Sequence, residues 1–178
     1  MIFKSEKYLY ILFLALFFGG CIFQGFYSGY HNLTSEDKER VVDIYSYSDI
    51  SNLTDLNSIY LIDPENLKLS LQEYDKNVIY VWNPLCSNSI HPSLVKAEAE
   101  EKGYKLWLIS ALFFQNIAEV DFGIPIYGIK ESIEYKPVTR YLKSFVRKLG
   151  CENYDLESFI VFNNGSYRYS TDIYDIVR

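Results

Sequence analysis

The strongest constraint on this chain is a short apolar run at residues 78–82 (Val-Ile-Tyr-Val-Trp), followed at once by Asn83-Pro84. β-Branched and aromatic residues in a run of this length favour a buried strand, and the Asn-Pro pair ends it. Residues 89–102 then place apolar side chains at helical spacing, and Gly103 ends that helix. Residues 104–110 predict a second strand. Strand, helix and strand make a right-handed βαβ unit with parallel strands.

The flanking segments extend this pattern to an α/β fold. A short capped helix is expected over residues 34–45 and a loop over 46–58. Ile59–Ile62 predicts a strand and Asp63-Pro64 the start of a helix, which gives the order βαβαβ. The remaining predicted elements are a helix over 111–120, an irregular segment or edge strand over 122–129, an amphipathic helix over 139–149, a β-hairpin over 158–170 around Asn164-Gly165, and a helix over 171–177.

Composition excludes several classes of function. The 178 residues suffice for one domain and a leader, and the net charge of −6 argues against nucleic acid, which needs a basic surface. Cys21, Cys86 and Cys151 are too few and too scattered for a disulfide scaffold or a zinc site. No metal-ligand spacing, phosphate-binding loop or Ser-His-Asp order is present, so no metal or cofactor is predicted.

Cys86, after the central strand, is the candidate functional residue. It is expected where the next helix begins, and a helix N-terminus lowers the pKa of a thiol because unpaired N–H groups stabilise the thiolate. The alternative is a small, half-buried residue that closes a strand–helix turn. His91 falls about 140° from Cys86 around a helix, so it is a poor base and a surface or capping role is expected. His31 is expected to have no specific role.

The beginning of the chain has the pattern of a secretory leader. Basic residues precede an apolar run over residues 8–18, and small residues follow it. The ending Phe18-Gly19-Gly20-Cys21 resembles the lipobox of bacterial lipoproteins, with Phe18 in place of the usual Leu. That resemblance implies cleavage after residue 20 and diacylation of Cys21.

Two alternatives to a lipoprotein signal stay open. Residues 8–27 are nearly continuously apolar over about the length that spans a bilayer, which suits an uncleaved anchor, although three glycines and Gln24 interrupt them. A cytosolic protein with a buried N-terminal helix would have to cover a large apolar patch. With either a lipid or an anchor, the rest of the chain lies outside the cytoplasm, with residues 24–33 as its tether.

The predicted order of elements from Ile59 onward is similar to the thioredoxin fold. Residues 81–89 (Val-Trp-Asn-Pro-Leu-Cys-Ser-Asn-Ser) resemble the Phe-Trp-Ala-x-Trp-Cys-x-x-Cys of membrane-tethered bacterial thiol-disulfide oxidoreductases, with matches at Trp82 and Cys86. Residues 159–165 resemble the later strand and turn of that family. The resemblance implies a three-layer α/β/α domain around a mixed sheet of about five strands. Its active-site turn would be Trp82, Asn83, Pro84 and Leu85 before Cys86.

The positions at which this sequence differs from the family's motif affect the chemistry expected of the chain. Ser89 occupies the position of the resolving cysteine, so a mixed disulfide at Cys86 could not be released from there. Cys151 falls in the loop that enters the hairpin, which the family order places on the active-site side. It could be a distant resolving cysteine, a disulfide partner of Cys86 or a buried free thiol. The other departures are Tyr80 in place of a buried acid, Leu85 in place of the second Trp, Pro92 two residues early, and the cis-proline position near Glu157, for which Pro125 comes too early.

These features predict a lipoprotein signal peptide over residues 1–20, a lipidated Cys21 with tether and helix over 21–57, and a thioredoxin-like domain over 58–178. The expected function is thiol-disulfide exchange through Cys86 with envelope proteins that carry cysteines or disulfides. The partner would be released from its mixed disulfide with Cys86 by an external thiol or by Cys151. The alternative is a redox-inactive domain that binds a partner protein in the envelope. Contact with the membrane would be through the lipid on Cys21.

Overall fold

The computed structural model of the chain describes residues 27–50, 53–86, 89–117, 120–152, 159–172 and 174. Within them, seven strands form one sheet in the order β1-β2-β5-β4-β3-β6-β7. The strands are β1 (Val41–Asp43), β2 (Ile59–Ile62), β3 (Lys76–Trp82), β4 (Lys105–Ser110), β5 (Ile126–Ile129), β6 (Phe159–Asn163) and β7 (Ser166–Ser170). The helices are η1 (Tyr30–Asn32), α2 (Ser35–Glu39), α3 (Tyr47–Ile50), α4 (Pro64–Leu71), α5 (Pro92–Glu101), η3 (Lys130–Ile133) and α6 (Val138–Lys148).

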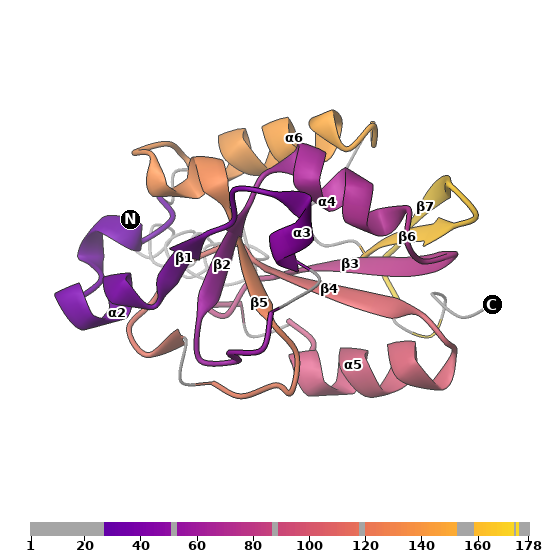
Figure 1. The fold of residues 1–178 in the computed structure, drawn as a ribbon, viewed down its shortest axis with the longest axis horizontal. Coiled ribbons are helices and arrows are strands. Elements are labelled where there is room, and N and C mark those ends of the chain that lie inside the picture. The colour runs from indigo at the N-terminus through magenta and orange to yellow at the C-terminus, as the bar shows by residue number, and fades with distance from the viewer. Residues whose placement is uncertain are drawn as a thin grey trace, which may run out of the picture.

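The sheet is mixed and has helices on both faces, which confirms the predicted α/β class. The five strands β1 to β5 pair in parallel, whereas β6 is antiparallel to β3 and forms a hairpin with β7. Figure 1 shows α3, α4 and α6 on one face and α5 on the other. The sheet has seven strands rather than the expected five or so, because β1 and β5 join it as well.

Each face of the sheet has its own apolar core. The core under α4 and α6 includes the fully buried side chains of Trp107, Tyr141 and Phe145. The core on the α5 side includes Leu108, Phe159 and Ile126. Strands that are covered on both faces have almost continuous apolar sequences, and β2, β3 and β4 follow this rule.

Several predicted elements are confirmed with their expected local chemistry. β3, α5 and β4 form the predicted parallel βαβ unit. The side chain of Asp63 caps α4 by accepting the backbone N–H of Asn66 at 2.8 Å. Asn164 and Gly165 have φ values of 48° and 81°, the left-handed backbone of a type I′ hairpin turn.

Other predicted elements are wrong for identifiable reasons. Val41–Asp43 is a strand rather than the second half of a helix, since its β-branched residues pair with β2. The expected loop over 46–58 contains α3, and β5 lies inside the sheet between β2 and β4 rather than at an edge. Residues 111–117 form no α-helix, because tertiary bonds to the N–H of Phe113 and the carbonyl of Ala111 hold them in an irregular path. The predicted helix over 171–177 falls mostly outside the described residues.

The predicted tether is partly packed against the domain. Phe113 donates its N–H to the carbonyl of Ser28 at 2.6 Å, and Leu33 is buried on the α5 side. Gly29 has a φ of 83°, and a Cβ there would lie 2.3 Å from the carbonyl oxygen of Phe113. The folded body therefore already includes the described residues 27–50, and the predicted boundary at residue 58 falls between the paired strands β1 and β2.

The predicted leader and the lipidation site at Cys21 lie outside the described residues. No helix in the described ranges has the length and apolar character needed to cross a bilayer.

Candidate functional site

The candidate site is the loop from Asn83 to His91, which leaves the carboxyl end of β3 and leads into α5. Asn83 organises it. Its carbonyl oxygen accepts the N–H of Cys86 at 3.2 Å and the hydroxyl of Ser89 at 2.7 Å, and its side-chain Oδ1 accepts the N–H of Leu85 at 3.1 Å. These bonds make a compact turn from which Leu85 projects, with 70% of its surface exposed. Cys86 lies next to it and is half-buried.

Cys86 is not at a helix N-terminus, so the predicted activation by the helix dipole is wrong. α5 begins at Pro92, six positions after Cys86, and the influence of a helix dipole is confined to its first turn. The helix is capped by His91, whose Nδ1 accepts the N–H of Ser93 at 3.4 Å. This confirms the capping role expected for His91.

The two cysteines in the described residues are not joined to each other. Cys86 is disulfide-bonded, whereas Cys151 is a free thiol with 2% of its surface exposed. Burial raises the pKa of the Cys151 thiol to about 11, so it is protonated and unreactive near neutral pH.

Cys151 also lies at the other end of the sheet. The backbone of the next residue, Glu152, is hydrogen-bonded to the hydroxyls of Tyr167 and Tyr169 in β7. β7 pairs with β6, and β6 pairs with β3, so these two tyrosines lie level with the first half of β3. Cys86, in contrast, follows the last residue of β3. The expectation that Cys151 lies on the same side as Cys86 is therefore wrong. The reason is that α6 runs back along the sheet from the carboxyl ends of the strands to their amino ends.

Tyr80 supports the loop. Its ring stacks on Phe159 with centroids 4.8 Å apart, and its hydroxyl donates to the carbonyl of Ile90 at 2.7 Å. Burial raises the pKa of Tyr80 to about 12, so it stays protonated at neutral pH. Tyr80 therefore fixes the end of the loop to β3 and does not exchange a proton near neutral pH.

An aromatic cluster that sequence reasoning missed lies beneath the loop. Trp82 packs edge-to-face against Phe114 and Phe122, with centroid distances of 6.1 and 5.1 Å, and the ring of His91 meets Phe122 at 5.4 Å. Phe114 and Phe122 come from the irregular segment after β4. Since a helix was expected over much of this segment, nothing in the sequence indicated that it would fold back onto Trp82.

The described residues contain no group of three or more His, Cys, Asp or Glu side chains that could hold a metal ion. Comparison of the chain with protein-family models, with curated proteins and with solved structures gave no match.

Proposed function

We propose that this chain is a membrane-tethered cell-envelope protein whose thioredoxin-like domain exchanges thiols and disulfides through Cys86. The observation that carries the proposal is the position of Cys86, in the loop after β3, where the parallel unit β3–α5–β4 meets antiparallel β6. The carboxyl ends of parallel strands are the edge at which sites of α/β proteins are built.

The arrangement of elements supports the thioredoxin-like part of the proposal. A parallel β3–α5–β4 unit is followed by α6 and then by a hairpin whose first strand pairs antiparallel with β3. This is the order that the resemblance around Trp82 and Cys86 implies. β1 and β5 are additions to it, and β5 separates β2 from β4.

The proposed reaction is a thiolate exchange with one protein cysteine. Two equivalents of an external thiol first reduce the disulfide that Cys86 holds in this structure. The Cys86 thiolate then attacks one sulfur of a partner's disulfide, a Cys86–partner disulfide forms, and the second partner sulfur leaves as a thiolate. Ser89 has no thiol with which to displace the partner, and Cys151 is buried and distant. The mixed disulfide is therefore opened in one of two ways. Either the partner's own second thiolate returns and reverses the step, or an external thiolate attacks the partner's sulfur, which regenerates the Cys86 thiolate and leaves the partner joined to the external thiol.

The proposed tether is supported by the leader and the lipobox-like residues that end at Cys21. Lipidation would convert the thiol of Cys21 into a thioether. A lipidated Cys21 therefore has no thiol with which to form or resolve a disulfide.

One observation favours a second candidate function, a redox-inactive domain that binds a partner without covalent chemistry. Cys86 lies six positions before α5 and so lacks the helix dipole that activates thiols. A binding module would use the same loop, with the exposed side chain of Leu85 as a contact.

Trapping of mixed disulfides distinguishes the two functions. The full chain, Cys86→Ala and Cys151→Ala are each expressed in the envelope, free thiols are blocked at lysis, and adducts are separated without reductant. We expect adducts with the wild type and with Cys151→Ala, and none with Cys86→Ala. Partners recovered equally well with Cys86→Ala, and recovered after reduction, would instead assign the domain to non-covalent binding.

A further inference from the structure

The outward face of α6 carries a row of three cations. Arg140, Lys143 and Arg147 are exposed, and their spacing of three and four residues places them in one row. Within the described part of the chain none of the three makes an ion pair, whereas Lys136 and Lys148 nearby pair with Glu134 and Glu131. In a chain of net charge −6 this row is a local positive surface.

The rest of α6 fixes this row in place. Its opposite face, with Tyr141, Leu142 and Phe145, is buried in the core, so the helix cannot rotate and withdraw the cations. The row also borders an open hollow of about 860 Å³ whose lining includes Lys136 and Glu152. Two carboxylates, Glu131 and Glu152, also line this hollow. Glu131 is paired with Lys148, and the single carboxylate that remains does not neutralise three cations.

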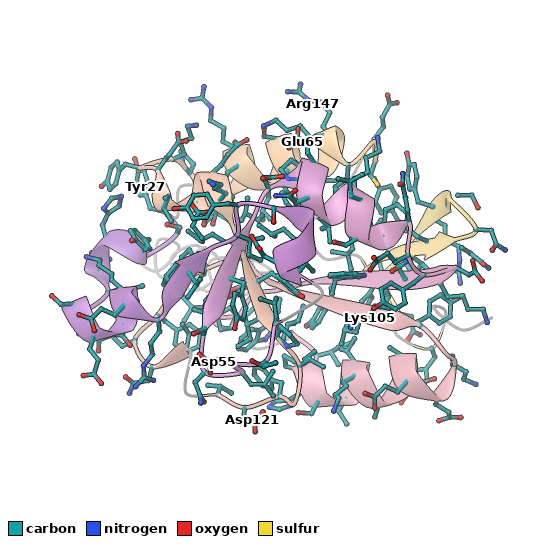
Figure 2. All side chains as sticks on the ribbon, viewed as in Figure 1. Tyr27, Asp55, Glu65, Lys105, Asp121 and Arg147 are labelled. Carbon is teal, nitrogen blue, oxygen red and sulfur yellow. The ribbon has the colours of Figure 1, made fainter. Side chains whose placement is uncertain are left out.

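The point where the chain enters the folded body lies beside the amino end of α6. Tyr27 forms an isolated β-bridge with Pro137, the residue before α6, and its ring stacks on Tyr135 at 4.1 Å. These two rings are 45% and 71% exposed, and exposed tyrosines are common at membrane–water interfaces. Figure 2 shows Tyr27 and Arg147 on the same side of the molecule as α6, with Asp121 on the other side.

Chain length brings this face within reach of a bilayer. Cys21 is six residues before Tyr27, so even a fully extended chain holds Tyr27 within about 20 Å of the lipidated cysteine. The eleven residues of α6 add only about 16 Å. The tether is therefore short enough for the row of cations to reach the membrane surface, where the attraction to anionic lipid acts over about 10 Å.

We propose that Arg140, Lys143 and Arg147 bind the anionic headgroups of the membrane that holds the tether. This orients the domain with α6 toward the lipid. The inference rests on the tether in the proposed function but not on the chemistry of Cys86.

Lysine footprinting on vesicles tests this orientation. The full chain is reconstituted into phosphatidylcholine vesicles and into vesicles that also contain phosphatidylglycerol, and acylation of single lysines is followed by mass spectrometry. We expect Lys143 to react severalfold more slowly on the anionic vesicles and to recover in high salt, because salt screens the attraction. Lys102, at the end of α5 on the other face, should react equally on both.

Charge-reversal variants with a matched control make the test specific. Arg140→Glu with Arg147→Glu leaves Lys143 as the reporter and should abolish its protection. Lys76→Glu with Lys105→Glu makes the same change of charge at the amino ends of β3 and β4, and should leave the protection intact. Loss of protection in both pairs would overturn the inference.

Flotation separates a failure of this inference from a failure of the tether. A chain that does not float with either kind of vesicle overturns the tether and the inference together. A chain that floats, but whose Lys143 reacts equally on both kinds, overturns the inference alone. Protection of Lys143 in detergent by an acidic peptide, with none on anionic vesicles, would assign the surface to a protein partner and also overturn it.

Discussion

Replacing Ser89 with cysteine is expected to convert Cys86 from a residue that holds its partner into one that releases it. Ser89 donates its backbone N–H to the carbonyl of Cys86 at 3.0 Å, the hydrogen bond of a four-residue turn. Such a turn keeps its end Cα atoms within about 7 Å, which overlaps the range a disulfide needs. The new thiol can therefore attack the mixed disulfide at Cys86, form an internal disulfide and free the partner.

The expected results are a loss of nearly all trapped adducts and a gain of catalytic turnover in a reductase assay with insulin and dithiothreitol. Ser89→Ala is the matched control, since it removes the same hydrogen bond to Asn83 without adding a thiol, and it should retain the adducts. Adducts that persist undiminished in Ser89→Cys would contradict the proposed place of Ser89 beside Cys86.

Asn77→Ala is expected to destabilise the fold by about 3–5 kcal/mol, because it leaves two buried polar groups and one partly buried carbonyl without partners. The side-chain Nδ2 of Asn77 donates to the carbonyls of Leu71 and Tyr74 at 2.9 and 2.7 Å, and its Oδ1 accepts the indole N–H of Trp107 at 3.0 Å. Asn77 is 1% exposed, so water cannot replace these bonds. The loss is a large fraction of the roughly 5–15 kcal/mol that stabilises a typical domain.

Denaturation of the full chain by urea, followed by circular dichroism, measures this change in the free energy of unfolding. Asn57→Ala is the control, since the exposed Asn57 uses only its backbone in a hydrogen bond, and it should change stability by no more than about 0.5 kcal/mol. A cost below about 1 kcal/mol for Asn77→Ala would show that this buried network contributes little.

The parts of the fold that sequence reasoning predicted correctly are those with strong local signals. β2, β3 and β4 were evident because strands buried on both faces are continuously apolar, and the hairpin was evident from Asn164-Gly165. β5 lacked such a signal. Its Gly128 packs so closely that an added Cβ would lie 2.9 Å from the ring of Phe113 and 3.1 Å from Leu61. A glycine selected by tertiary packing looks, in sequence, like one that ends a strand.

The difference between strong local signals and tertiary packing also explains which parts of the candidate site could be predicted. The position of Cys86 after the central strand followed from the run before it, but the start of the next helix did not. The signal for this start is Pro92, because proline is common at the first position of a helix. The location of Cys151 could not be derived from its neighbours, since it depends on the direction in which α6 crosses the sheet.

The most direct test of the account is the reactivity of the two thiols in the reduced, folded chain. Iodoacetamide is added with and without urea, and the modification of each cysteine is followed by mass spectrometry. We predict that Cys86 reacts in the folded chain at a rate within a few-fold of that in the unfolded chain. Cys151, with its buried thiol and raised pKa, should react only after unfolding. Protection of Cys86 until the chain unfolds, or reaction of Cys151 before Cys86, would contradict the proposal that Cys86 is the exchanging thiol.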